Sequence, residues 1–156
     1  LEGYLPATPF GIVELLKRYD IETSGRECVV IGRSNIVGRP PSILLSRKGT
    51  DATVTLVHSR TRDIASHLRR ADIIVAALGS PGFVTADMIK QGAVVIDVGT
   101  TRVPSPSARS GWKLVGDVDF DNVAPLCSWI TPVPGGVGPM TRVALLRNTL
   151  MAVELK

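Results

Sequence analysis

Residues 29–40 read Val-Val-Ile-Gly-Arg-Ser-Asn-Ile-Val-Gly-Arg-Pro. A run of β-branched residues ends at Gly32, a short polar turn follows, and Gly38 begins a new apolar segment. This order predicts a buried strand, a tight turn and the start of a helix. Such a turn can bind the phosphates of a dinucleotide, because a helix N-terminus attracts anions. The spacing is Gly-x-Ser-x-x-x-Gly and not Gly-x-Gly-x-x-Gly, so a plain strand-turn-helix unit is the alternative.

The composition describes a globular protein with an aliphatic core. Hydrophobic residues make up 44% of the 156 residues, charged residues 21% and aromatic residues 4%. The length suits one domain with a substantial core. No apolar run approaches the roughly 20 residues that cross a bilayer, and no signal peptide is recognisable. We therefore expect a soluble, cytoplasmic protein that does not bind membranes.

The counts of cysteine, histidine and charged residues argue against a disulfide framework, a metal site and a nucleic-acid site. Two cysteines beside apolar runs indicate buried thiols in a reducing compartment. Two histidines without paired-cysteine spacing argue against a metal site. The net charge of +4 comes from residues 1–70, with 11 Lys/Arg against 7 Asp/Glu. Because the arginines are scattered and no aromatic residues lie between them, we expect a small polyanionic ligand and no nucleic acid.

The rest of the chain alternates between strand-like and helix-like segments. Thr8 suits an N-cap and Pro9 the first position of a helix over 9–19. Val143, Leu146, Leu150 and Val153 form one apolar stripe on a last helix over 140–155. Further strands are expected over 28–31, 52–57, 72–76, 93–98, 113–118 and 128–131. Further helices are expected over 38–47, from Thr61 or Asp63, over 85–90 and over 119–123, and 104–111 reads as a surface hairpin or loop.

This alternation predicts an α/β fold, a Rossmann-type three-layer sandwich with a mostly parallel, doubly wound sheet. Ligands of such sheets bind at the carboxyl ends of the strands. Small and phosphate-compatible residues recur at five expected strand ends, namely 32–34, 58–60, 79–81, 99–100 and 134–136. Their convergence predicts a nucleotide site.

Several motifs together resemble one family. They are Pro-Ala-Thr-Pro-x-Gly at 6–11, Val-Ile-Gly-Arg-Ser-x-Ile-Val-Gly at 30–38, Val-Ile-Asp-Val-Gly at 95–99, Gly-Asp-Val at 116–118 and Ile-Thr-Pro-Val-Pro-Gly-Gly-Val-Gly-Pro-Met-Thr at 130–141. This set is similar to the bacterial bifunctional methylenetetrahydrofolate dehydrogenase/methenyltetrahydrofolate cyclohydrolase family. The resemblance covers essentially the whole chain but only the family's C-terminal domain. It implies an NADP-binding domain over 1–156, with 1–25 as linker and first helix and the N-terminal catalytic domain absent.

The resemblance implies an enzyme of one-carbon metabolism that oxidises 5,10-methylenetetrahydrofolate with NADP and hydrolyses the methenyl product to 10-formyltetrahydrofolate. Members are homodimers that hold the folate in a cleft between two domains. Carried over by position, Gly32, Arg33 and Ser34 would cradle the cofactor phosphates and Ser59 would lie near the ribose 2′-phosphate. Thr100 would lie beside the nicotinamide, contacting it through its backbone. Pro134, Gly135 and Gly136 would line the nicotinamide and folate side of the cleft.

Cofactor choice also follows from the residues themselves. A site that prefers NAD usually has an acid after the second strand, whereas this chain has His-Ser-Arg-Thr at 58–61. Arg60 and Arg33 offer guanidinium groups that match phosphate geometry, so NADP is favoured over NAD. Arg60 as a solvated surface charge is the alternative. Thr141 is either a hydroxyl of the helix start or a cofactor contact.

No residue of this chain is expected to be catalytic. The family's catalytic lysine lies in a Tyr-x-x-x-Lys motif, but the residues four positions after Tyr4 and Tyr19 are Thr8 and Thr23. We expect Asp97 to be bound by nearby backbone amides and not to act as a base. The chain alone is therefore expected to be inactive, because acid–base catalysis needs a positioned proton carrier. A non-catalytic nucleotide-binding or assembly module is the alternative function.

Overall fold

The computed structural model describes residues 3–154 and contains one five-stranded parallel sheet with the order β2-β1-β3-β4-β7. Its strands are Glu27–Ile31 (β1), Thr53–Val57 (β2), Ile73–Ala76 (β3), Val94–Asp97 (β4) and Trp129–Ile130 (β7). The α-helices are Ala7–Arg18 (α1), Arg39–Ser46 (α2), Ile64–Arg70 (α3), Phe120–Val123 (α4) and Val137–Glu154 (α5). Single 3₁₀ turns are Ala86–Met88 (η1) and Ala124–Leu126 (η2). The first two residues of the predicted linker, and Leu155 of the predicted last helix, lie outside the described residues.

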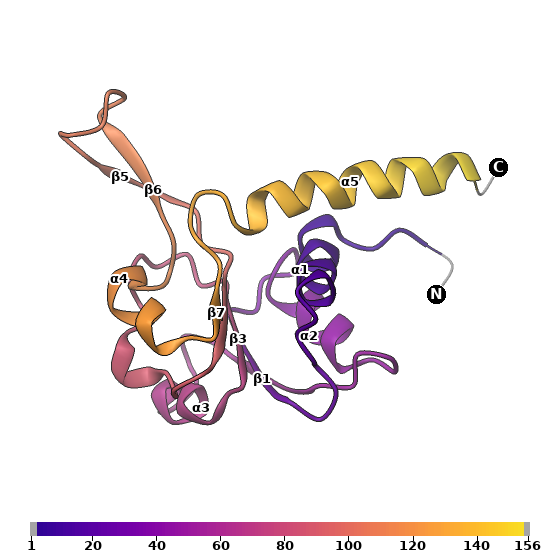
Figure 1. Ribbon diagram of the computed structural model, residues 1–156, viewed down its shortest axis with the longest axis horizontal. Coiled ribbons are helices and arrows are strands. Elements are labelled where there is room, and N and C mark those ends of the chain that lie inside the picture. The colour runs from indigo at the N-terminus through magenta and orange to yellow at the C-terminus, as the bar shows by residue number, and fades with distance from the viewer. Residues whose placement is uncertain (1–2, 155–156) are drawn as a thin grey trace.

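Helices cover both faces of the sheet, α1 and α2 on one side and α3 and α4 on the other (Figure 1). Strand β1 contributes side chains to the cores on both faces of the sheet, because successive side chains point to opposite faces. Cys28 and Val30 pack with Ile12 of α1, whereas Val29 and Ile31 pack with residues such as Leu68 of α3. The predicted three-layer Rossmann-type fold with a doubly wound parallel sheet is confirmed.

The start of α1 differs from the prediction. The helix begins at Ala7, and the amide of Phe10 donates to the carbonyl oxygen of Pro6 at 3.0 Å. Thr8 is therefore inside the first turn and is not the N-cap. Its hydroxyl forms a tertiary hydrogen bond with Thr141 instead, 3.0 Å between the two oxygens. The N-cap position is occupied by Pro6, which has no side-chain acceptor to cap the helix.

The strand predicted over 113–118 forms as Trp112–Val115 (β6), but outside the main sheet. It pairs antiparallel with Thr101–Pro104 (β5), a strand that the sequence did not reveal. The two strands form an arm that projects from the sheet (Figure 1), and most of their side chains are exposed. Few apolar side chains face a core here, which explains the weak sequence signal. The helix predicted over 85–90 is also reduced, to the single turn η1.

Helix α5 packs through a different face from its apolar stripe. Its buried residues are Val137 and Ala144, and Gly11 of α1 lies against the backbone of Met140. The stripe, Val143, Leu146, Leu150 and Val153, is 42%, 71%, 59% and 68% exposed. Beyond its first turns the helix extends past α1 (Figure 1). Within residues 3–154, no helix combines the length and apolar character needed to cross a membrane.

Candidate functional site

The Gly32–Gly38 turn has two glycines whose positions exclude a side chain. Gly32 has a φ of +113°, and a β-carbon there would lie 2.9 Å from the carbonyl carbon of Ala77, overlapping its oxygen. A β-carbon on Gly38 would lie 2.5 Å from the carbonyl carbon of Gly32. The chain therefore turns tightly after β1 and brings α2 against the strand end. These are the two tasks that glycines perform in dinucleotide-binding turns.

Ser34 replaces the middle glycine of the usual pattern and holds the turn together. Its hydroxyl oxygen accepts hydrogen bonds from the amides of Val37 at 3.1 Å and Gly38 at 3.2 Å. The amide of Arg39 donates to the carbonyl oxygen of Ser34 at 2.9 Å. A serine hydroxyl can accept two hydrogen bonds and still donate its own proton. Ser34 is exposed, so this proton can reach a bound anion.

The free amides of the turn lie before α2 and not inside it. Within the described residues, the amides of residues 33–36 donate no hydrogen bond to the protein. In the first turn of α2, Pro40 and Pro41 have no N–H to offer. Successive free amides in a turn form a concave anion site. An anion at this position would therefore be held mainly by the loop backbone.

The end of β2 presents Ser59 and Arg60 to solvent. His58 fixes this loop, because its Nδ1 accepts from the amide of Arg60 at 3.2 Å and its own amide donates to the Thr61 hydroxyl at 3.0 Å. Neither Arg33 nor Arg60 has a side-chain partner among residues 3–154. Both guanidinium groups are free to bind a phosphate.

A cavity of about 560 Å³ lies at the carboxyl end of β4. It brings together five predicted site residues, namely Thr100, Pro134, Gly135, Gly136 and Thr141. Val37 of the phosphate-compatible turn lines the same cavity. The cavity lining does not include Gly32, Arg33, Ser34, Ser59 or Arg60. The ten predicted residues thus form two neighbouring groups along one edge of the sheet, joined at Val37.

Thr141 satisfies one of its two predicted roles. Its hydroxyl forms the interhelical hydrogen bond with Thr8 and also reaches the carbonyl oxygen of Val137 at 3.3 Å. It therefore fixes the start of α5 against α1. Both threonines also line the cavity, so a cofactor contact by Thr141 stays a prediction.

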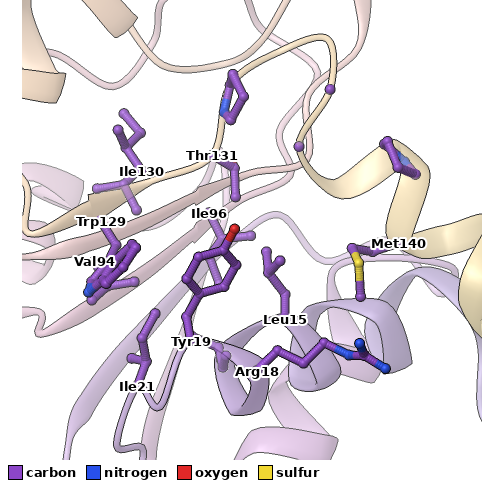
Figure 2. A pocket seen from close by; sticks show the side chains of 16 residues that line it. Leu15, Arg18, Tyr19, Ile21, Val94, Ile96, Trp129, Ile130, Thr131 and Met140 are labelled. Carbon is purple, nitrogen blue, oxygen red and sulfur yellow. The ribbon is translucent and has the colours of Figure 1, made fainter.

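A second cavity, of about 480 Å³, lies on the other side of the loop that follows β7. Figure 2 shows its walls: Leu15 from α1, Tyr19 directly after that helix, Val94 and Ile96 from β4, and Trp129 from β7. The rings of Tyr19 and Trp129 are 4.9 Å apart and tilted by 59°. The first cavity has threonines, glycines, Asp97 and Arg142 among its valines and prolines. The second is walled mainly by larger apolar side chains. Arg18 also lines this cavity, but its guanidinium is paired with Glu14 at 2.9 Å, so the cavity offers little to a phosphate.

Metal sites and reactive thiols place their own requirements on the described residues. Among residues 3–154, no group of three His, Cys, Asp or Glu side chains could hold a metal ion. Both cysteines are free. Burial raises the pKa of the Cys28 thiol to about 12 and that of Cys127 to about 11. Thiols with such values are unreactive at neutral pH.

The fold agrees with the comparisons with known proteins. A family model for the NAD(P)-binding domain of tetrahydrofolate dehydrogenase/cyclohydrolase matches residues 6–156. The chain belongs to this family.

Relatives of the family extend well beyond this domain. The bifunctional protein FolD of Bacteroides fragilis is 66% identical over 154 residues, which cover 97% of this chain and 53% of that protein. The FolD dehydrogenase/cyclohydrolase of Campylobacter jejuni superposes with a TM-score of 0.90 at 46% identity, covering 98% of this chain and 51% of that chain. The Trypanosoma brucei enzyme, solved with NADP and an inhibitor, gives a TM-score of 0.87 at 51% identity, covering 94% of this chain and 49% of that chain. This chain spans about half the length of the curated relatives it matches.

Within this NAD(P)-binding domain, Asp97 has the predicted structural role. Its carboxylate is buried and accepts from the amides of Gly99 at 2.9 Å, Asp117 at 3.0 Å and Val118 at 3.0 Å. Burial raises the pKa of Asp97, while these hydrogen bonds oppose that shift. Because both oxygens accept hydrogen bonds from backbone amides, the Asp97 carboxylate holds the surrounding loops in place.

Asp117 is the residue of this edge that sequence reasoning missed. It is fully buried, and its Oδ2 accepts from the amides of Leu78 at 2.7 Å and Gly79 at 2.9 Å. The sequence contains its motif, Gly-Asp-Val at 116–118, but a lone acid near the end of a predicted strand gives no sign of burial. The signal that could have found it is the pair of glycines at 99 and 116, since a β-carbon on either would meet one of the two carboxylates.

Proposed function

We propose that this chain is the NADP-binding domain of a bifunctional enzyme that oxidises 5,10-methylenetetrahydrofolate to the 5,10-methenyl form and hydrolyses that product to 10-formyltetrahydrofolate. One observation carries the proposal: Val37, in the phosphate-compatible turn, lines the same cavity as Thr100 and Gly135. A dinucleotide needs an anion site continuous with a pocket for its second base. Membership of the dehydrogenase/cyclohydrolase family supports the reaction.

The residues present fit NADP. The free amides of residues 33–36 and the Ser34 hydroxyl would hold the pyrophosphate, beside Gly32. Arg60 and Ser59 would face the ribose 2′-phosphate, and Arg33 would add a second guanidinium. The strand end at 58–61 has no acid to bind a ribose 2′-hydroxyl, which favours NADP over NAD. A guanidinium can bind phosphate through two parallel hydrogen bonds.

The cavity at β4 suits the nicotinamide half. Thr100 would contact the nicotinamide through its backbone, and Pro134, Gly135, Gly136 and Thr141 would form the opposite wall. When bound, NADP supplies the acceptor for the hydride removed from the folate. The residues of this chain would bind NADP, orient its nicotinamide and exclude water from one side of that ring.

We further propose that the folate lies in a cleft between this domain and a second, catalytic domain. In this chain, threonine occupies position 8 and position 23, each four residues after a tyrosine, where the family's motif has lysine. The exposed apolar stripe on α5 supports a packed partner, because contiguous apolar surface of this kind is rare on isolated domains. The complete enzyme is proposed to be a homodimer and to act in the cytoplasm. Residues 1–25 are proposed to form the linker and first helix.

Titration of this chain with NADP and with NAD tests the cofactor assignment. We expect saturable binding of NADP at a lower concentration than NAD. Binding of neither at millimolar concentration would contradict the proposal. A second assay, with 5,10-methylenetetrahydrofolate and NADP, tests the division of labour between domains: we expect no turnover by this chain alone. Turnover by this chain would show that the catalytic groups lie within it.

A further inference from the structure

Two buried carboxylates connect the loops at one half of the site edge. Asp117 accepts from the amides of Leu78 and Gly79 in the loop that follows β3. Asp97, at the end of β4, accepts from the amides of Gly99 and of Asp117 itself. The loops after β3 and β4 and the return from the β5–β6 arm are thereby held in a single network.

This network also reaches the loop after β7. The amide of Asp97 donates to the Thr131 hydroxyl at 2.8 Å, and Pro132 follows directly as part of the cavity wall. The other half of the edge has separate supports. There, Ser34 holds the turn after β1, and His58 holds the loop after β2. None of the hydrogen bonds from these two residues reaches either carboxylate.

The carboxylate network and the Ser34 and His58 contacts correspond to the two halves of a dinucleotide. A doubly wound sheet binds the two halves of the cofactor on either side of the point where the strand order reverses. Arg33 and Arg60, the candidates for phosphate binding, lie at the ends of β1 and β2. Gly99 and Thr100 line the cavity at β4. The hydrogen bonds of the carboxylate network therefore lie under the nicotinamide half, and the network meets the phosphate turn only by packing, where the Leu78 loop lies against Gly32.

Asp117 is poorly explained as a purely stabilising residue. Its Oδ1 is buried and has no hydrogen-bond partner among the described residues. A buried carboxylate that lacks full hydrogen bonding is costly. That oxygen faces the α-carbon of Gly99, where a β-carbon would lie 2.6 Å from the Asp117 carboxyl carbon. The carboxylate thus determines how closely the Gly99 loop approaches the Leu78 loop.

We propose that Asp117 is a positioning residue for the nicotinamide half of the cofactor site. It acts through the amides of Leu78 and Gly79 and through its packing on Gly99, and it does not line the cavity. This inference rests on the proposed NADP function. It predicts that loss of the Asp117 carboxylate weakens binding of the nicotinamide half of NADP and leaves binding of the adenosine half almost unchanged.

The test compares NADP with adenosine 2′,5′-bisphosphate, which contains only the adenosine half. For Asp117→Ala we expect NADP affinity to fall by about tenfold or more, because hydrogen bonds to a charged group are lost. Affinity for the bisphosphate should change by less than about twofold, since its contacts lie elsewhere. Asp117→Asn keeps an oxygen that can accept from both amides and should recover most of the NADP affinity.

Asp72→Ala is the matched control. Asp72 also accepts from a backbone amide, that of Glu27 at 2.9 Å, but it precedes β3 at the opposite edge of the sheet. This variant should lower stability and leave the ratio of the two affinities unchanged. Equal loss of both ligands in Asp117→Ala, or no loss of NADP affinity, would overturn the inference.

A measurement on the unaltered chain covers the case in which Asp117→Ala does not fold. NADP should slow amide hydrogen exchange at Leu78, Gly79 and Gly99 more than the bisphosphate does. Equal slowing by both ligands would overturn the positioning role. Failure of the unaltered chain to bind either ligand would instead remove the proposed function, and this inference with it.

Discussion

The α-carbon of Gly32 faces the carbonyl oxygen of Ala77 with no room for a β-carbon between them. Gly32 follows β1, and Ala77 follows β3, the neighbour of β1 in the sheet. The amide of Ala77 donates to the carbonyl oxygen of Ile31 at 2.8 Å, which holds the two strand ends together. The tight turn that offers its amides to an anion therefore depends on the adjacent strand as well as on its own sequence.

Gly32→Ala should destabilise the chain by about 3 kcal/mol or more and weaken NADP binding, because the positive φ and the overlap with Ala77 both penalise a side chain. Gly49→Ala is the matched control. Gly49 has a similar φ of +100° but open space around its α-carbon. Its substitution should cost about 1–2 kcal/mol, with NADP affinity retained. Urea unfolding and NADP titration of both variants measure the two effects, and equal costs would show that the overlap is unimportant.

Removing both exposed guanidinium groups should erode the preference for NADP. In Arg33→Ala/Arg60→Ala, the ratio of NAD to NADP dissociation constants should fall about tenfold or more, because charge-assisted hydrogen bonds to the 2′-phosphate are lost. Arg47→Ala/Arg70→Ala removes the same charge from exposed positions at the C-terminal ends of α2 and α3. Titration of each double variant with both cofactors gives the ratio. An unchanged ratio in the first variant would contradict the 2′-phosphate assignment.

The sheet was predictable because its strands are almost wholly apolar. Segments such as 73–76 and 94–97 are buried at every position, and parallel strands covered on both faces produce such runs. The strand-turn-helix unit was predictable for a related reason: Gly32 and Gly38 occupy positions where backbone meets backbone. The glycines mark these positions in the sequence, although Gly32 meets Ala77 only once the sheet has formed.

The arm, the packing of α5 and the role of Asp117 depend on contacts that local sequence does not encode. The periodicity of α5 identifies an apolar stripe correctly, but not whether this chain covers it. Here α1 contacts another face of α5, where the amide side chain of Asn148 donates to the carbonyl oxygen of Leu5 at 2.8 Å. Asp117 was missed for a similar reason, since its partners lie 38 and 39 residues earlier in the chain.

The Asp72–Lys90 pair should make stability fall with acid. Its hydrogen bond from Lys90 lowers the pKa of Asp72. A carboxylate whose pKa is lowered by folding contributes stability above its ordinary pKa of about 3.9 and loses it as the pH falls through the lower folded value. Asp72→Asn should thus be less stable than the unaltered chain at pH 7, by roughly 0.5 kcal/mol or less because the pair is partly exposed. Urea unfolding at pH 7 and pH 3 should show the gap closing, and a gap independent of pH would refute this account.

The exposed stripe of α5 should be dispensable for this chain and required for the complete enzyme. Leu146 and Leu150 are 71% and 59% exposed, so Leu146→Glu/Leu150→Glu should change the free energy of unfolding of this chain by no more than about 0.5 kcal/mol per site. Ala144 is the matched control on the same helix, only 2% exposed. Ala144→Glu should destabilise the chain strongly, because it buries a charge.

In the complete enzyme, the stripe variant should lose dehydrogenase activity while the affinity of this domain for NADP stays unchanged. The reason is geometric: the proposed NADP contacts lie at the strand ends, whereas the stripe would position the proposed catalytic domain. Loss of a few buried leucine contacts between domains is worth several kcal/mol, enough to separate two domains joined by a short linker. Steady-state rates and NADP titrations on the same preparation distinguish the two effects. Full activity in the stripe variant would mean that the second domain packs elsewhere.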